Sequence, residues 1–103
     1  MTKRLSLAVV LFEGFELLDV FGPLEMFGLL PEQFEIFLVA ENGDIVASNQ
    51  GPKSLVDYRF EDCPAFDILL VPGGKGTRRE VDNPVLLDWL RSQAQTAQYV
   101  TSV

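Results

Sequence analysis

The first candidate for chemistry is Asp19, a carboxylic acid set among apolar residues. Leu17-Leu18 precede it and Val20-Phe21 follow it. A carboxyl group in a ligand site can donate and accept protons during a reaction. Near the start of a helix, the same residue can also be a surface carboxylate that the helix dipole stabilises, and the pattern alone favours that interpretation. Three further carboxylates compete for a proton-transfer role: Glu13, Glu16 and Glu25.

The second candidate is the glycine-rich run Pro72-Gly73-Gly74-Lys75-Gly76. Glycine permits a positive φ and lets backbone N–H groups approach a ligand closely, so such a loop can hold an anion or a developing oxyanion. The run does not fit the phosphate motifs, because Gly76 follows Lys75 in place of serine or threonine and Arg79 replaces the third glycine of a dinucleotide motif. An oxyanion or anion site and a structural turn without a ligand remain equally open.

Other reactive residue types are few. Cys63, the only cysteine, lies between Asp62 and Pro64. Neighbouring acids raise the pKa of a thiol, so we interpret Cys63 as a structural residue and not as a nucleophile. The sequence contains no histidine, which excludes a Ser-His or Cys-His pair and a His-ligated metal site within these residues. The basic residues near the glycine run are interpreted as a solvated face: Lys75, Arg78 and Arg79.

Composition indicates one small globular domain. The chain has 103 residues, of which 48% are hydrophobic and 22% are charged, a balance typical of folded proteins. Its net charge is −7, whereas proteins that bind nucleic acid carry basic faces, so we exclude nucleic acid as a partner of this region. A single cysteine excludes an internal disulfide framework and suits a reducing compartment. We therefore predict a cytoplasmic protein.

Four apolar runs predict strands of a parallel sheet: residues 5–12, 34–40, 67–71 and 98–103. The first follows two basic residues and imitates a signal peptide. Charged residues come directly after it without a small-residue cleavage site, so we interpret it as a strand buried on both faces, in the middle of the sheet. No apolar run approaches the roughly 20 residues that cross a bilayer.

Helical patterns and turn signals separate these strands. Residues 15–30 have helical periodicity, and Gly22-Pro23 predicts a kink or a restart at Pro23. Asn83-Pro84 predicts the start of a second helix, with asparagine as N-cap and proline at the first helical position. Asn42-Gly43 is a hairpin signal, and short irregular strands are expected over residues 45–56. A loop or short helical turn is expected over residues 60–64.

This order of strands and helices is typical of an α/β fold with an open, mostly parallel sheet. Ligands bind such sheets beyond the carboxyl ends of the strands. The helix carrying Asp19, the glycine run and whatever follows Val103 all come after such strand ends. Because no helix follows the last predicted strand to cover it, we expect the whole protein to continue for about another half of a domain.

The ordered set of motifs resembles the ThiJ/PfpI family of class I glutamine-amidotransferase-like proteins. The matching stretches span nearly the whole chain: residues 17–25, 60–64, 71–76 and 99–103. The resemblance implies a flavodoxin-like three-layer sandwich. Residues 1–103 would form the N-terminal part of a single α/β domain and end just before the expected nucleophile elbow. Within the family, residues 60–64 and 90–103 look most like the isonitrile hydratases.

The resemblance also implies roles for particular residues. The family's acid in the helix after the first strand matches Asp19, and it pairs with a catalytic cysteine that is expected directly after Val103. Gly74 matches the glycine that offers its N–H to the oxyanion hole, and Gly73 lies beside it in the substrate-binding loop. The implied reaction is the hydration of an isonitrile, a small-molecule substrate, to an N-substituted formamide. No metal or organic cofactor is implied.

Two other functions remain open. Other family members are amidases, peptidases, glyoxalases or deglycases, and some AraC-type transcription regulators carry such a domain as a non-catalytic ligand sensor. Family members are commonly homodimers, and four phenylalanines indicate surplus aromatic surface near one edge: Phe12, Phe15, Phe21 and Phe27. We therefore expect a homodimer with the helix containing Asp19 close to the interface, and no membrane partner.

Overall fold

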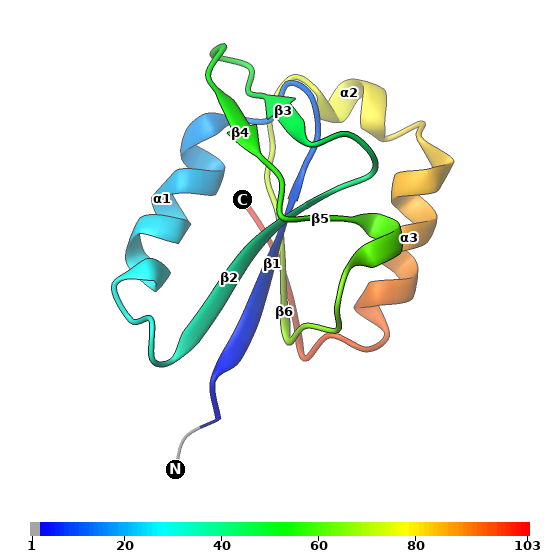
Figure 1. The fold of residues 1–103 in the computed structure, drawn as a ribbon. Coiled ribbons are helices and arrows are strands. Elements are labelled where there is room, and N and C mark those ends of the chain that lie inside the picture. Colours follow the sequence, from blue (N-terminus) through cyan, green and yellow to red (C-terminus); the bar gives the residue numbers. More distant parts are fainter. Residues whose placement is uncertain (1–2) are drawn as a thin grey trace.

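The computed structural model describes residues 3–103, which form a five-stranded parallel sheet flanked by helices (Figure 1). The strand order is β5-β2-β1-β6-β7. In chain order these strands are β1 (Leu5–Leu11), β2 (Phe34–Ala40), β5 (Tyr58–Arg59), β6 (Ile68–Val71) and β7 (Tyr99–Ser102). Helix α1 (Leu17–Gly28) lies on one side of the sheet and α3 (Pro84–Ala94) on the other. The predicted flavodoxin-like α/β fold with a parallel sheet is confirmed.

The central strand is β1, as its apolar sequence predicts. It pairs with β2 over seven residue pairs and with β6 over three. Ala8, Val9 and Val10 are fully buried. A strand covered on both faces needs apolar side chains in both directions, which explains why this run shows no alternation of polar and apolar residues.

The two long helices lie where the sequence predicts them. Of the two outcomes predicted at Pro23, a kink or a restart, the restart is wrong. Helix α1 runs uninterrupted through Pro23. The proline removes one backbone donor, yet Val20 is fully buried and the same helix packs Leu24 and Phe27 against the core, so packing keeps the helix continuous. Helix α3 begins as predicted, because Asn83 Oδ1 accepts a hydrogen bond from the Val85 N–H at 3.1 Å. No helix among residues 3–103 has the length and apolar character to span a membrane.

The excursion between β2 and β5 contains a hairpin, but its turn is not the predicted one. Strands β3 (Ile45–Ala47) and β4 (Lys53–Leu55) pair antiparallel, so residues 48–52 form the turn, where Gly51 has a φ of 110°. Asn42-Gly43 instead joins β2 to β3, which belong to different sheets. The expected short helical turn is present as η1 (Phe60–Asp62). A four-residue helix, α2 (Thr77–Glu80), was not predicted.

The phenylalanines that were expected to provide surplus aromatic surface are mostly used by the core. Phe12 and Phe15 are 7% and 0% exposed. Phe27 packs edge to face against Phe34, with ring centroids 4.9 Å apart. Of the four, Phe21 is exposed, at 41%. The aromatic argument for a dimer is therefore wrong, because the sheet needs apolar cover on both faces and takes these rings for it.

Asp67 ties β1 to β6 at the amino end of the sheet. Its Oδ2 accepts hydrogen bonds from the N–H of Ser6 at 2.9 Å and from the Ser6 hydroxyl at 3.2 Å. Lys3 forms an ion pair with its other carboxylate oxygen at 3.4 Å. The bond from the Ser6 N–H is the main cause that lowers the pKa of Asp67 from its ordinary value. The two central strands are thus joined at the end opposite to the glycine run.

Candidate functional site

Two loops meet at the carboxyl ends of β1 and β6. One joins β1 to α1, and the other joins β6 to α2. The Glu16 N–H donates to the Gly73 carbonyl at 2.9 Å, and the Gly76 N–H donates to the Gly14 carbonyl at 3.1 Å. The chain proceeds from β1 to β2 on one side and from β6 to β7 on the other. This is therefore the switch point of the sheet, where open α/β folds bind ligands.

The close contact between these loops requires glycine at two positions. Gly74 has a φ of 120°, and a Cβ at this position would lie 2.5 Å from both the Glu16 nitrogen and the Gly14 oxygen. A Cβ on Gly76 would overlap the carbonyl oxygen of Glu13. These neighbours are backbone atoms, which cannot rotate away as a side chain can. The two loops approach this closely because both positions lack a side chain.

Asp19 reaches the glycine loop from the first turn of α1. Its Oδ2 accepts a hydrogen bond from the Gly73 N–H at 3.0 Å, and the residue is half-buried. The N–H of Gly74, the next residue, donates to no group among residues 3–103. The fold therefore brings the three predicted site residues together and leaves one unbonded N–H next to the residue that holds the carboxylate.

The other acids considered from the sequence lie elsewhere. Glu13 Oε2 accepts a hydrogen bond from the Ala47 N–H, and Glu16 Oε1 accepts one from the side-chain amide of Gln50 at 3.0 Å. Glu25 is exposed. Within the part of the chain that the structure describes, Asp19 is the one of these four acids whose side chain bonds to the glycine loop.

Gln50 is a neighbour of the site that the sequence analysis missed. Its Oε1 accepts a hydrogen bond from the Leu17 N–H at 3.1 Å, while its Nε2 donates to Glu16 Oε1. The first N–H groups of a helix lack partners within the helix, so Gln50 caps α1 and fastens the hairpin to it. No local signal could have found this contact, because Gln50 and Leu17 are 33 residues apart in the chain.

The backbone that follows β7 lies beside the same residues. The Val103 N–H donates to the Val71 carbonyl at 3.1 Å. A Cβ placed on Gly73 would be 3.3 Å from the Val103 carbonyl oxygen and 3.1 Å from Asp19 Oδ2. Gly73 therefore lies between the Asp19 carboxylate and the backbone of Val103, in contact distance of both.

Cys63 lies at the other end of the sheet, before β6, and packs against the core. Burial raises the pKa of its thiol to about 11. The direction agrees with the interpretation from the sequence, but the cause is burial and not the neighbouring acids. A thiol with this pKa is protonated at neutral pH and is a poor nucleophile. Among residues 3–103, no three His, Cys, Asp or Glu side chains are grouped so as to hold a metal ion.

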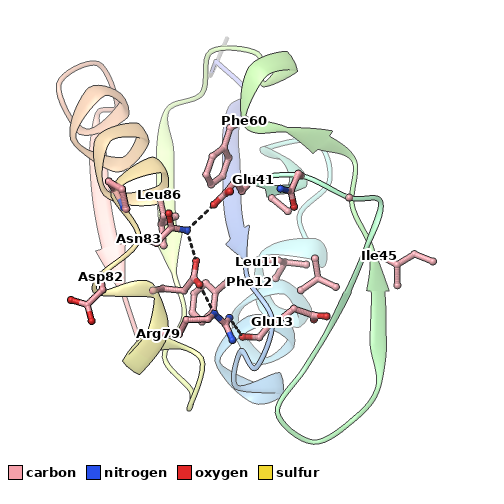
Figure 2. Close-up of a pocket in the computed structure, with 16 residues that line it drawn as sticks. Leu11, Phe12, Glu13, Glu41, Ile45, Phe60, Arg79, Asp82, Asn83 and Leu86 are labelled. Carbon is pink, nitrogen blue, oxygen red and sulfur yellow. Dashed lines mark hydrogen bonds and ion pairs between the residues drawn. The ribbon is translucent and has the colours of Figure 1, made fainter.

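A separate cavity of about 920 Å³ lies between the carboxyl ends of β1 and β2 and the start of α3 (Figure 2). The polar side chains that line the cavity bond to one another and to the backbone. Asn83 Nδ2 donates to Glu41 Oε1 at 2.7 Å and to Glu80 Oε1 at 3.0 Å. Arg79 pairs with Glu80 and also donates to the Glu13 carbonyl at 2.7 Å. Its side chain is 58% exposed, as the predicted solvated face requires. Asp19 and the Gly73-Gly74 pair do not line this cavity.

The parallel sheet, with a carboxylate bonded to a glycine loop at its switch point, defines a flavodoxin-like protein with a candidate site at the sheet edge. Residues 5–103 match the DJ-1/PfpI family, and the chain belongs to that family. The resemblance inferred from the motifs is thereby confirmed.

Individual relatives agree with this assignment. The chain is 37% identical over 99 residues to isonitrile hydratase of Pseudomonas putida. The alignment covers 96% of this chain and 43% of that protein. A ThiJ/PfpI family protein from Pseudomonas syringae superimposes with a TM-score of 0.90 at 29% identity, over 98% of this chain and 42% of that one. An AraC family transcriptional regulator from Pseudomonas putida superimposes with a TM-score of 0.78 at 20% identity, over 96% of this chain and 64% of that one. At this identity the match shows a shared fold alone. The chain thus spans less than half the length of the isonitrile hydratase that it matches.

Proposed function

We propose that the protein containing this chain hydrates isonitriles to N-substituted formamides at the carboxyl edge of the sheet. The observation that carries the proposal is the hydrogen bond from the Gly73 N–H to Asp19 Oδ2, in a chain 37% identical to isonitrile hydratase. It sets an acid directly against a loop that offers an unbonded N–H. An acid moves protons, and a fixed N–H stabilises negative charge on oxygen.

The nucleophile in this proposal is a cysteine directly after Val103, with residues 1–103 forming the N-terminal part of a single domain. The position of Val103 in the fold supports this assignment. Because the Val103 carbonyl adjoins Gly73, the next residue starts beside Asp19 and Gly74. Cys63 cannot take this role, since it lies at the opposite end of β6 and its pKa of about 11 keeps it protonated.

The proposed reaction adds one water in three steps. The thiolate sulfur bonds to the isonitrile carbon, which takes a proton from Asp19 and becomes a thioimidate. Asp19 then takes a proton from water and passes it to the nitrogen as the hydroxyl bonds to the carbon. Finally Asp19 removes the hydroxyl proton, the C–S bond breaks, and the thiolate and the formamide are released. The Gly74 N–H faces the oxygen when it becomes negative, and the covalent intermediate divides one difficult addition into easier steps.

Formamide production from a simple isonitrile by the full-length protein tests this function. We expect turnover by the native protein and loss of turnover after alkylation with iodoacetamide at neutral pH. Cys63→Ser is the control, and it should keep full activity because Cys63 lies away from the site. The absence of formamide with folded, unalkylated protein, or a residue after Val103 without a nucleophilic side chain, would contradict the proposal.

Two alternatives would both give no formamide in this experiment and differ in what they do with another ligand. A ligand-sensing domain, whose fold an AraC family regulator shares, would bind a small molecule without converting it. Another ThiJ/PfpI enzyme, such as an amidase, peptidase, glyoxalase or deglycase, would leave the isonitrile intact and convert its own substrate class.

We also propose that the protein is a homodimer that associates through the outer face of α1. Exposed apolar side chains on this helix and at its C-cap, Leu29, support the proposal: Leu18, Phe21, Met26 and Leu29. We expect light scattering at micromolar concentration to give the mass of a dimer, and the double variant Leu18→Gln/Met26→Gln to give that of a monomer. The control is Val81→Gln, an exposed apolar residue outside α1. A monomeric mass for the unaltered protein would exclude the proposal.

A further inference from the structure

The direction of the Gly74 N–H is set first by the residue before it. All peptide bonds in the described part of the chain are trans, so each carbonyl and the following N–H point in opposite directions. The Gly73 carbonyl is bonded to the Glu16 N–H at 2.9 Å. The Gly74 N–H therefore points away from Glu16 and the loop that follows β1. This bond involves backbone atoms alone.

The peptide after Gly74 is held by a side chain, that of Thr77. The Gly74 carbonyl accepts a hydrogen bond from Thr77 Oγ1 at 2.7 Å and a second from the Thr77 N–H at 3.1 Å. Glycine is the residue whose backbone rotates most freely, and Gly74 has the left-handed φ of 120°. With the peptide planes on both sides held, the torsions of Gly74 are fixed.

We propose that Thr77 is a positioning residue of the candidate site, whose hydroxyl holds the Gly74 carbonyl and so helps to fix the torsions of Gly74 and the direction of its N–H. The inference rests on the proposed function and assigns no contact between Thr77 and the substrate. Without the hydroxyl, one bond at 3.1 Å remains on the Gly74 carbonyl, and the torsions of Gly74 are no longer fixed. The preceding peptide, which carries the Gly74 N–H, is then held firmly on one side alone, by the bond from the Glu16 N–H to the Gly73 carbonyl. Hydrogen bonds weaken steeply as they lose alignment, so a donor that moves stabilises a developing oxyanion less well.

The chain offers a matched control for this side-chain bond. Thr96 Oγ1 donates to the Gln93 carbonyl at 3.2 Å, which is also three residues earlier, after the end of α3 and away from the site. In the full-length protein, we expect Thr77→Val to lower kcat by about tenfold with KM changed by less than about twofold, since charge on the oxygen develops in the transition state. Thr77→Ser should restore most of the loss, and Thr96→Val should leave kcat unchanged. A folded Thr77→Val protein with the wild-type kcat would overturn the inference.

An NMR measurement distinguishes failure of this inference from failure of the proposed function. The amide resonance of Gly74 reports the orientation of its N–H whether or not the protein turns over an isonitrile. We expect Thr77→Val to shift or broaden this resonance, and Thr77→Ser and Thr96→Val to leave it in place. If the native protein produces no formamide, the proposed function fails while the resonance still tests Thr77. An unchanged Gly74 resonance in Thr77→Val disproves the positioning role.

Discussion

Replacement of Asp19 by asparagine is expected to leave the full-length protein folded and to lower isonitrile turnover by about 10²- to 10⁴-fold, the usual effect of losing a general acid–base group. Asparagine has nearly the same shape, and its Oδ1 can still accept the hydrogen bond that the Gly73 N–H now donates at 3.0 Å. An amide cannot deliver or remove a proton at neutral pH. The measurement is kcat for formamide production, with circular dichroism as the check on folding.

Two further variants make the Asp19 result specific. Glu25→Gln removes an exposed carboxylate from the same helix and should change turnover little. Asp19→Glu should keep partial activity, because the resemblance to the family includes members with glutamate at this place. Wild-type turnover by folded Asp19→Asn would show that Asp19 is a surface carboxylate without a part in the reaction.

Replacement of Gly74 by alanine is expected to destabilise the protein strongly. Two costs add: about 1–2 kcal/mol for a left-handed conformation with a side chain, and about 1–3 kcal/mol for forcing a methyl group into a packed contact. The Cβ would lie 2.5 Å from two backbone atoms of the neighbouring loop, so the loops would have to separate. Denaturant unfolding followed by circular dichroism measures the sum, about 2–5 kcal/mol.

Two other glycines separate these costs. Gly51 has a φ of 110° and nothing within 4 Å of an added Cβ, so Gly51→Ala should show the conformational cost alone. Gly76 has no positive φ, but its Cβ would overlap the Glu13 carbonyl, so Gly76→Ala should show the steric cost alone. If Gly74→Ala is no more destabilising than Gly51→Ala, contact between the loops is not the reason for glycine at position 74.

Features coded by local pattern could be predicted from the sequence. The buried strand β1 and the Asn83 cap of α3 both follow from a few adjacent residues. Asp19 and the Gly73-Gly74 pair were found from their residue types and from the resemblance to a family. The hairpin turn was misplaced because turn residues show where the chain bends but not which strands pair.

The supporting residues of the site could not be predicted. Gln50 acts on a helix start 33 residues away, and Thr77 belongs to a helix of four residues, too short to show a period. The helix restart expected at Pro23 is wrong for a related reason, since the packing that keeps α1 continuous depends on core residues contributed by distant strands. Each of these contacts is a property of the assembled fold.

The two loops at the sheet edge are joined by hydrogen bonds between main-chain atoms, and three glycines let the loops meet: Gly14, Gly74 and Gly76. A substitution at Lys75, an exposed residue of the glycine loop, can therefore change the charge at this edge while the Glu16–Gly73 and Gly76–Gly14 backbone bonds remain. The backbone contact between the two loops can therefore stay the same while the exposed side chains around it change. In directed evolution, a library that varies position 75 and keeps glycine at 14, 74 and 76 would sample new substrates with little loss of folded variants.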